Sequence, residues 1–274
     1  MTGGPVFDWF RRRRRERVLR DAAIPQVLWD EARAALPFLA PFDADELARL
    51  RALAVLFLDD KAIVGARGHV VTPVQRVVIA IEACVLVLNL DLAWFDDFEN
   101  IIVYPDEFTP GWEYEDEAGV VHTQEGPLAG EAMPRGPVIL SWPDVAASAD
   151  WDVAGMNLVI HEFAHKMDMR SGEANGCPPL PPDIPQKLWE AKLGAAYEHF
   201  SARVRLGRHT HIDPYAAEHP AEFFAVLAEV FFADPWCLRR EYRGVYELYV
   251  RFFRQDPAAR LDRAAGAAAP SSAP

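Results

Sequence analysis

The stretch NLVIHEFAHKM, residues 157–167, holds two histidines four positions apart and a glutamate directly after the first. Apolar residues surround them, which predicts an amphipathic helix. Residues four apart on a helix lie about 40° apart around its axis, so His161 and His165 can hold one metal ion. Glu162 is rotated by about 100° around the helix axis from His161, and it can act on a water bound to that metal. The alternative is a pair of core histidines bonded to carbonyl groups, which the intervening glutamate disfavours.

Catalytic zinc sites use three protein ligands and keep one position open. The continuation HExxHxxGxxH is absent, because Asp168 and Ser171 stand where its glycine and third histidine belong. The third ligand must therefore come from a later element that packs beside the motif helix. The candidates are His199, His209, His211, His219, Glu218, Glu222 and Glu229.

Two of these acids lie in the run AEFFAVLAE, residues 221–229, which otherwise reads as an apolar helix. Glu222 and Glu229 are seven residues apart and therefore share one helix face. A buried carboxylate is costly unless it is hydrogen-bonded or binds a metal, and this favours the two acids over the loop histidines. Glu222 has a second interpretation, as an acid that caps the helix N-terminus after Pro220.

The overall charge argues against a nucleic-acid-binding protein. Forty-one acidic residues against 28 basic ones give a net charge of −13, whereas such proteins present a basic surface. The basic run Arg11–Arg15 has no aromatic or glycine-rich platform beside it and predicts a solvated arm. We expect a flexible basic arm over residues 1–24, one domain over 25–263 and a disordered tail over 264–274.

Localisation follows from the cysteines and the apolar runs. Cys84, Cys177 and Cys237 form no CxxC pair, which favours a reducing cytoplasm over a disulfide framework. The residues after the arginine run are too polar for a signal peptide. The most apolar stretch, residues 77–95, is interrupted by polar residues and predicts a buried helix rather than a membrane span. We expect a soluble cytoplasmic protein.

Periodicity predicts helices on both sides of a β-rich middle. The helices are expected over residues 43–60, 73–90, 152–169, 186–205, 220–233 and 238–253. Asp43 and Glu46 predict a capping box at the first of them. Short strands are expected over residues 101–104, 120–122 and 138–142. The acidic loop Pro105–Gly119 is either a solvated connection or a flap over a cleft.

Four segments carry a family resemblance. They are WFDDFENIIVYP (94–105), GPVILSW (136–142), NLVIHEFAHKMDMRSGEANG (157–176) and YAAEHPAEFFAVLAEVFF (215–232). With them the chain resembles the Mlc titration factor A family of zinc-dependent bacterial peptidases, over roughly residues 25–263. The last segment also resembles the protease domain of lethal factor. In both families a tyrosine stands seven residues before the ligand glutamate, a spacing kept here by Tyr215 and Glu222.

The resemblance implies one zinc ion held by His161, His165 and Glu222, with Glu162 as the catalytic base and Tyr215 beside the site. It leaves Glu229 as a partner that orients a histidine. It also implies aminopeptidase-like activity on small peptide substrates and binding of the glucose repressor Mlc.

We therefore predict an α+β, zincin-like metallopeptidase. N-terminal helices pack against a small mixed sheet, the motif helix lies under that sheet, and C-terminal helices bring in Glu222. A peptide substrate adds to an exposed strand edge, for which Val138–Trp142 is the candidate. Two alternatives stay open: a repressor-sequestering protein with a structural zinc, which would need a fourth protein ligand, and a zinc hydrolase of non-peptide amides.

Overall fold

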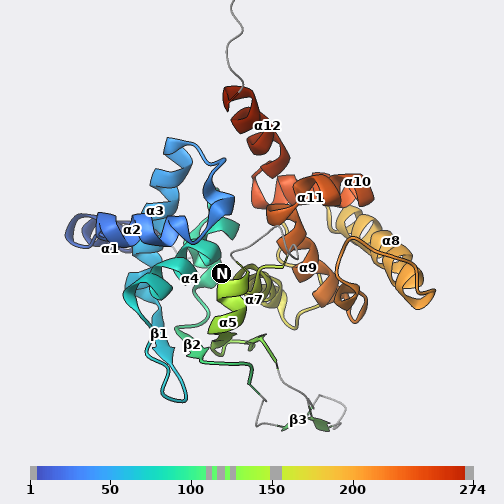
Figure 1. Cartoon of the computed structure of the whole chain (residues 1–274), viewed down its shortest axis with the longest axis horizontal. Helices are drawn as coiled ribbons and strands as arrows, with labels where there is room; N and C mark the ends of the chain where they lie inside the picture. Colours follow the sequence, from blue (N-terminus) through green and yellow to red (C-terminus); the bar gives the residue numbers. More distant parts are fainter. Residues whose placement is uncertain (1–4, 109–112, 116–120, 124–127, 149–155, 269–274) are drawn as a thin grey trace, which may run out of the picture.

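Helices make up most of the molecule and pack beside a small four-stranded sheet (Figure 1). The computed structural model describes residues 5–108, 113–115, 121–123, 128–148 and 156–268. The α-helices are α1 (Pro5–Asp21), α2 (Gln26–Ala34), α3 (Ala44–Asp60), α4 (Pro73–Leu86), α5 (Trp142–Ala147), α7 (Leu158–Asp168), α8 (Gln186–Arg205), α9 (Pro220–Ala233), α10 (Pro235–Glu241), α11 (Arg243–Phe253) and α12 (Pro257–Ala268). Short 3₁₀ helices are η1 (Pro37–Leu39), η2 (Leu92–Phe95), η3 (Met169–Ser171) and η4 (Pro214–Ala217).

The main sheet has the strand order β1 (Ala62–Gly65), β2 (Asn100–Tyr104), β6 (Val138–Ser141) and β5 (Gly130–Ala132). β1, β2 and β6 are parallel, and β5 is antiparallel to β6. All four residues of β6 are buried, as expected for an inner strand covered on both faces. The predicted α+β class with a small mixed sheet is confirmed.

The edge strand is not the one that the sequence predicts. Val138–Trp142 was expected at the edge, but β6 lies between β2 and β5 and both of its sides are hydrogen-bonded. The edge beside β6 is β5, where Gly130 pairs with Leu140 and Ala132 with Val138. The sequence Gly-Glu-Ala has little intrinsic strand preference, so β5 forms because of tertiary pairing.

The motif helix α7 is shorter than predicted. Helix was expected from about Asp152 to Met169, but α7 begins at Leu158 and residues 149–155 lie outside the described part. Asn157 has an extended backbone, and its side chain accepts a hydrogen bond from the backbone N–H of Ile160 at 2.8 Å. This N-cap ends the helix on that side.

The other predicted helices agree more closely. α8 and α9 have the expected bounds, and the capping box of Asp43 and Glu46 at α3 is present. α4 ends at Leu86 rather than residue 90. The predicted last helix over residues 238–253 is two helices, α10 and α11, which meet at Tyr242 in a non-helical conformation.

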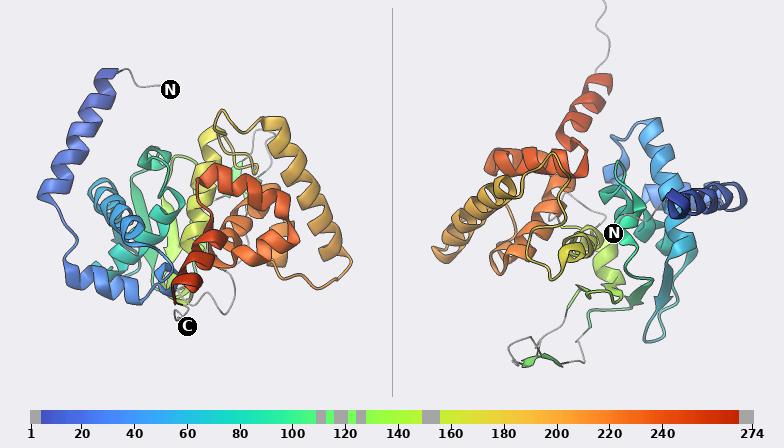
Figure 2. Two further views of the ribbon diagram at one scale, coloured as in Figure 1. Left: turned by 90° about the horizontal axis from the view of Figure 1, so that it is seen from above. Right: turned by 180° about the vertical axis from the view of Figure 1, so that it is seen from behind.

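Helix α7 lies at the centre of the molecule. It contacts α4 on one side and α9 on the other, and it also contacts β5 and β6. In Figures 1 and 2 it lies between the N-terminal helices and the C-terminal helices α8 to α11. Phe163 of α7 packs among the rings of Phe57, Phe95 and Phe98. Buried residues from Val18 to Ala258 form one hydrophobic cluster around this helix.

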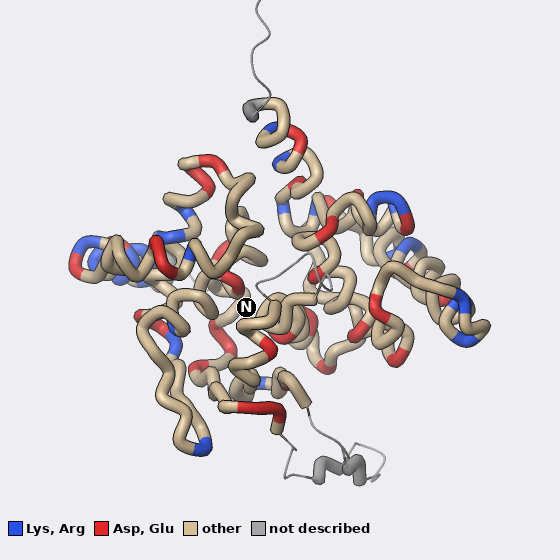
Figure 3. Tube along the Cα trace, viewed as in Figure 1, with Lys and Arg blue, Asp and Glu red and all other residues tan. Residues whose placement is uncertain are grey.

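Most of the segment predicted as a flexible basic arm over residues 1–24 forms helix α1, Pro5–Asp21. α1 lies at the periphery of the molecule (Figure 2), and its positions coloured as basic in Figure 3 include Arg11, Arg14 and Arg15, which form ion pairs with acidic residues of the body. Ion pairs join Arg11 to Asp96 at 2.8 Å and Arg15 to Asp91 at 2.8 Å. Composition alone does not reveal these acids, because they come from elements far along the chain.

The tail predicted over residues 264–274 is also partly ordered. Residues 264–268 continue α12, while 269–274 lie outside the described residues. Arg260 of α12 is buried and donates hydrogen bonds to Glu46 of α3 at 2.9 and 3.0 Å. This buried charge pair joins the C-terminal helix to the N-terminal helices.

The loop Pro105–Gly119 is described only in part. Phe108 forms a bridge with Leu128, and β3 (Glu113–Glu115) pairs antiparallel with β4 (Val121–Thr123). Residues 109–112 and 116–119 of the loop lie outside the described residues, so its role as a flap stays a prediction.

Helix α4 buries one carboxyl group in its apolar face. Glu82 is fully buried, and its Oε1 accepts a hydrogen bond from Nδ2 of Asn157 at 2.7 Å. Oε2 has no hydrogen-bond partner among the described residues. Burial raises the pKa of Glu82 to about 8 from its ordinary value of 4.5. The folded protein therefore keeps this proton at neutral pH, whereas the unfolded chain releases it.

We predict that Glu82→Gln changes the pH dependence of stability. Because the folded pKa is raised, the wild-type free energy of unfolding falls as pH rises from about 4.5 to about 8. Glutamine lacks the titration and keeps an acceptor for Asn157, so the variant should be more stable at pH 8 by roughly 1–3 kcal/mol. Urea unfolding from pH 4.5 to 8.5 measures this difference. Parallel curves for the two proteins would contradict the predicted burial of a neutral acid.

Candidate metal centre

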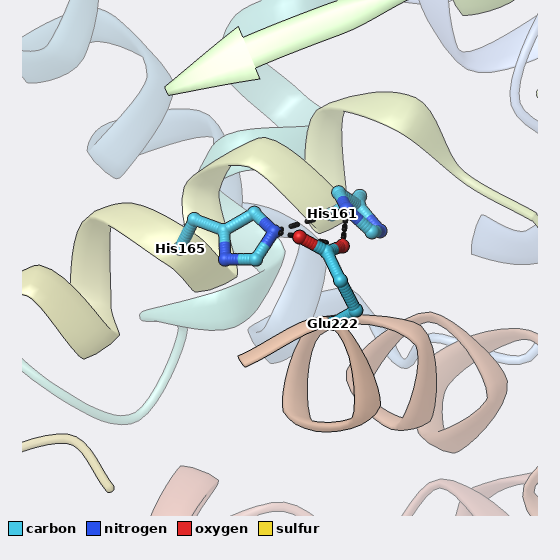
Figure 4. Close-up of side chains that lie close together, drawn as sticks. All are labelled: His161, His165 and Glu222. Atoms are coloured by element: carbon cyan, nitrogen blue, oxygen red, sulfur yellow. Dashed lines mark hydrogen bonds and ion pairs between the residues drawn. The ribbon is translucent and has the colours of Figure 1, made fainter. Parts of the chain in front are cut away.

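Three side chains from two helices converge on one point (Figure 4). His161 and His165 project from α7, and Glu222 reaches them from the first turn of α9. The Nε2 atoms of the histidines are 3.1 Å apart. Oε2 of Glu222 lies 3.1 Å from His161 Nε2 and 3.3 Å from His165 Nε2. Of the candidates from the sequence, the structure thus brings Glu222 to the histidine pair.

The donor set fits zinc. Two imidazoles and one carboxylate form a frequent ligand set of catalytic zinc, and ligands at 2.0–2.1 Å in tetrahedral geometry lie about 3.3 Å apart. The three separations in the structure are close to that value. Burial opposes ionisation of Glu222, but its hydrogen bonds to both imidazoles hold the pKa of this carboxyl well below its usual range. The third donor is therefore a carboxylate at neutral pH.

Glu229 holds the other nitrogen of His161. Its Oε1 lies 2.7 Å from His161 Nδ1, and the carboxyl group is almost fully buried. A carboxylate at Nδ1 favours the tautomer that carries its proton there and leaves the Nε2 lone pair free for a metal. Glu229 and Glu222 both come from α9, two helical turns apart.

Glu162 lies beside the cluster in a nearly dry position, with 4% of its surface exposed. Burial raises the pKa of Glu162 to about 7, although the positive charges of His161 and His165 would lower it. A carboxyl group with a pKa near neutrality can both accept and donate a proton. The sequence prediction of its place next to the histidine pair agrees with the geometry.

Tyr215 lies next to His161, with ring centroids 6.3 Å apart. It is part of η4, where Asp213 accepts a hydrogen bond from its backbone N–H at 2.8 Å. Partial burial and the negative charges of Glu222 and Glu162 raise the pKa of Tyr215 far above its ordinary value. Its hydroxyl therefore stays protonated and can donate a hydrogen bond.

A cavity of about 640 Å³ opens beside these residues. Its walls come from β5 and the segment before it, α5, α7, η4 and α9. The lining residues are Leu128, Ala129, Gly130, Asp144, Ala147, Ser148, Met156, Leu158, His161, Glu162, Asp213, Tyr215, Val226 and Glu229. The size suits a small ligand, and the surface combines apolar side chains with carboxylates.

Comparison with known proteins agrees with this geometry. The model of the family described as glucose-regulated metallo-peptidase M90 matches residues 9–254. The chain belongs to the M90 metallopeptidase family. It is 40% identical to Mlc titration factor A of Salmonella arizonae over 238 residues, which cover 85% of this chain and 93% of the relative. It is 37% identical to Mlc titration factor A of Yersinia pestis over 239 residues, which cover 86% and 87% of the two chains.

The resemblance stated from the sequence is thereby confirmed, and the chain is a member of a metallopeptidase family with a His/His/Glu cluster. Among the helices of the described residues, none is long and apolar enough to cross a membrane.

The remaining candidate ligands have other contacts in this M90 family member. His199 lies 3.1 Å from the hydroxyl of Tyr242, and His219 caps α9 by accepting from the N–H of Ala221. His209 and His211 pack against each other with ring centroids 5.0 Å apart. Within the described part of the chain, the one cluster with metal-binding geometry is that of His161, His165 and Glu222, and Glu218 is not in it.

Two residues near the metal-binding cluster were not identified from the sequence. Asn157 could have been recognised, because an asparagine directly before an apolar run is a typical N-cap. No sequence pattern marks Gly130, because its importance comes from the packing of β5 against α7.

Buried Lys166 holds the β5–β6 turn by donating hydrogen bonds to the carbonyls of Met133 at 2.9 Å and Gly136 at 3.3 Å.

Gly130 leaves room for the glutamate of the motif. A Cβ atom at this position would lie 2.4 Å from Oε1 of Glu162 and 2.7 Å from Cδ1 of Leu158. The end of the Glu162 side chain can move away, so a larger residue here displaces that carboxylate rather than the backbone.

We predict that Gly130→Ala lowers peptide hydrolysis by about 10–100-fold, because a misplacement of about 1 Å costs rate on this scale. Metal binding should persist, since the three converging donors do not contact Gly130. Activity and zinc content of the purified variant measure both effects. Gly194→Ala is the matched control, because a Cβ atom there meets no atom within 4 Å. Equal activity of both variants would contradict the prediction.

Proposed function

We propose that this chain is a zinc-dependent peptidase with aminopeptidase-like action on small peptides, and that Glu162 is its general base. One observation carries the proposal: three metal-binding donors converge at a cavity beside a buried carboxyl group that has a pKa near neutrality. The proposed ligands of one zinc ion per chain are His161, His165 and Glu222. When bound, zinc supplies a Lewis acid that polarises a carbonyl group and lowers the pKa of water.

Glu162 has the position and pKa for two proton transfers. It accepts a proton from the attacking water and later donates it to the nitrogen of the departing amine. A pKa of about 7 supports both directions near neutral pH. The low exposure of the side chain keeps bulk water from competing for that proton.

Tyr215 is proposed to stabilise the oxyanion. Its hydroxyl stays protonated because burial and nearby carboxylates oppose ionisation. A hydrogen bond from this hydroxyl to the developing negative charge would lower the barrier, because the charge is largest in the transition state.

Strand β5, which ends the main sheet among the described residues, is proposed to align the substrate. It replaces the edge that the sequence predicted at Val138–Trp142. An extended peptide that pairs with β5 would pass Glu162, since Gly130 packs against that side chain. Asp144 and Asp213 line the cavity, and a carboxylate there could attract the free α-ammonium group of a short peptide. The negative charge of these two carboxylates supports a preference for peptides with a free N-terminus, as in an aminopeptidase.

Binding of an Mlc-like repressor is proposed as a second function. The relatives at 37–40% identity are named Mlc titration factor A and align over most of both chains. A purely structural zinc is less well supported, because such a site is closed by a fourth protein ligand and the described cluster has three. A zinc hydrolase of non-peptide amides would use the same residues.

We predict that Glu162→Gln retains zinc but lowers peptide hydrolysis by about 10²–10⁴-fold, the range for loss of a general base. The measurement is cleavage of N-terminally free and blocked fluorogenic peptides, with and without a chelator, together with zinc content. Glu198→Gln on the exposed face of α8 is the control. Near wild-type hydrolysis by zinc-loaded Glu162→Gln would refute the proposed base. Unchanged repressor binding by the same variant would separate the two functions.

We predict that Tyr215→Phe lowers kcat by about 10²–10³-fold, as for loss of one oxyanion donor. KM and zinc content should stay near wild type, because the hydrogen bond strengthens only in the transition state. Steady-state kinetics of the zinc-loaded variant on one cleaved peptide give both constants. A change in KM alone would assign Tyr215 to substrate binding instead.

A further inference from the structure

Asn157 joins three elements at the start of α7. Its side-chain oxygen caps α7 by accepting from the N–H of Ile160 at 2.8 Å. Its side-chain amide donates to Oε1 of Glu82 on α4 at 2.7 Å. Its backbone N–H donates to Oε2 of Glu229 on α9 at 2.5 Å. Asn157 and Glu82 are both fully buried, so water does not compete for these hydrogen bonds.

The third of these bonds reaches the metal cluster. Glu229 has both of its oxygens engaged, Oε2 by the N–H of Asn157 and Oε1 by Nδ1 of His161 at 2.7 Å. Two contacts on opposite oxygens fix the plane of a carboxylate. The orientation of the His161 ring therefore depends on where the backbone of Asn157 lies.

Glu82 determines that backbone position together with the helix cap. The N-cap hydrogen bond from Ile160 holds only the side-chain oxygen of Asn157. The hydrogen bond to Glu82 holds the side-chain nitrogen. With both ends of the amide engaged, the side chain has one rotamer, and the backbone N–H points at Glu229. Neither side chain contacts the metal-binding atoms of His161, His165 and Glu222. The backbone carbonyl of Asn157 accepts the helical hydrogen bond from the backbone N–H of His161 at 2.9 Å.

We propose that Asn157 and Glu82 are positioning residues of the metal centre, which act on His161 through Glu229. The inference rests on the proposed metal site but not on its peptidase activity. The positioning effect concerns one of the proposed metal ligands, His161. Nδ1 of His165 has no hydrogen-bond partner among the described residues, so this network orients His161 only.

The test measures zinc affinity by competition with a chelator in folded, full-length protein. Asn157→Ser keeps a capping oxygen but lacks the amide donor, and Glu82→Met keeps the volume but lacks the acceptor. Each variant should bind zinc about tenfold more weakly, at the low end of the range for partners of a metal ligand. The visible absorption bands of the cobalt-loaded proteins should also shift, because the His161 ring changes its angle.

Two control variants separate this role from general stability. Glu82→Gln keeps an acceptor for Asn157 and should retain wild-type zinc affinity and cobalt spectrum. Ile81→Val removes one buried methyl group from the neighbouring position of α4 and should lower thermal stability without changing affinity.

A double-mutant cycle tests whether Asn157 acts on His161 through Glu229. Once Glu229→Ala has removed the carboxylate, adding Asn157→Ser should weaken zinc binding no further. Full addition of the two losses would overturn the proposal, and so would wild-type affinity in both Asn157→Ser and Glu82→Met. If His161→Ala binds zinc as tightly as wild type, the proposed metal site itself is refuted, and this inference with it.

Discussion

His161 is held by a carboxylate at each of its ring nitrogens, and both carboxylates come from α9. Glu222 lies at Nε2 and Glu229 at Nδ1, at 3.1 and 2.7 Å. Their seven-residue spacing places them on one face of α9, so a single contact between α7 and α9 engages both nitrogens. Any shift of one helix along the other would break both contacts, and the relative position of these helices therefore sets the geometry of the site.

The interior around this contact holds acids from α9 and from α4 where a helical core would otherwise be apolar. Glu229 and Glu82 are almost fully buried, and burial raises the pKa of both groups. The cost is offset by hydrogen bonds that converge on Asn157, and for Glu229 by the bond to His161. Burial of the same kind brings the pKa of Glu162 near neutrality, which suits a group that takes up and releases a proton.

Where sequence reasoning failed, the missing information was a long-range contact. Residues 11–14 are exposed, as predicted, but the ion pairs of Arg11 with Asp96 and of Arg15 with Asp91 were missed because these acids are about eighty residues away in the chain. Residues 264–268 looked disordered by composition, but α12 is joined to α3 through Arg260 and Glu46. β5 has no strand pattern of its own and exists by pairing with β6.

The sequence by itself determined the helix that carries His161, Glu162 and His165, because helical periodicity is local and fixes which side chains share a face. It also narrowed the third donor to two acids on one helix. The spacing of the residues left both acids open, and the family resemblance assigned Glu222 as the ligand. The tertiary structure brings Glu222 to Nε2 and Glu229 to Nδ1 of His161. The tertiary structure also decided that β5, rather than β6, ends the main sheet among the described residues, and that Asn157 connects α4, α7 and α9. Strand order and buried hydrogen bonds join residues distant in the chain, and no local pattern encodes such pairs.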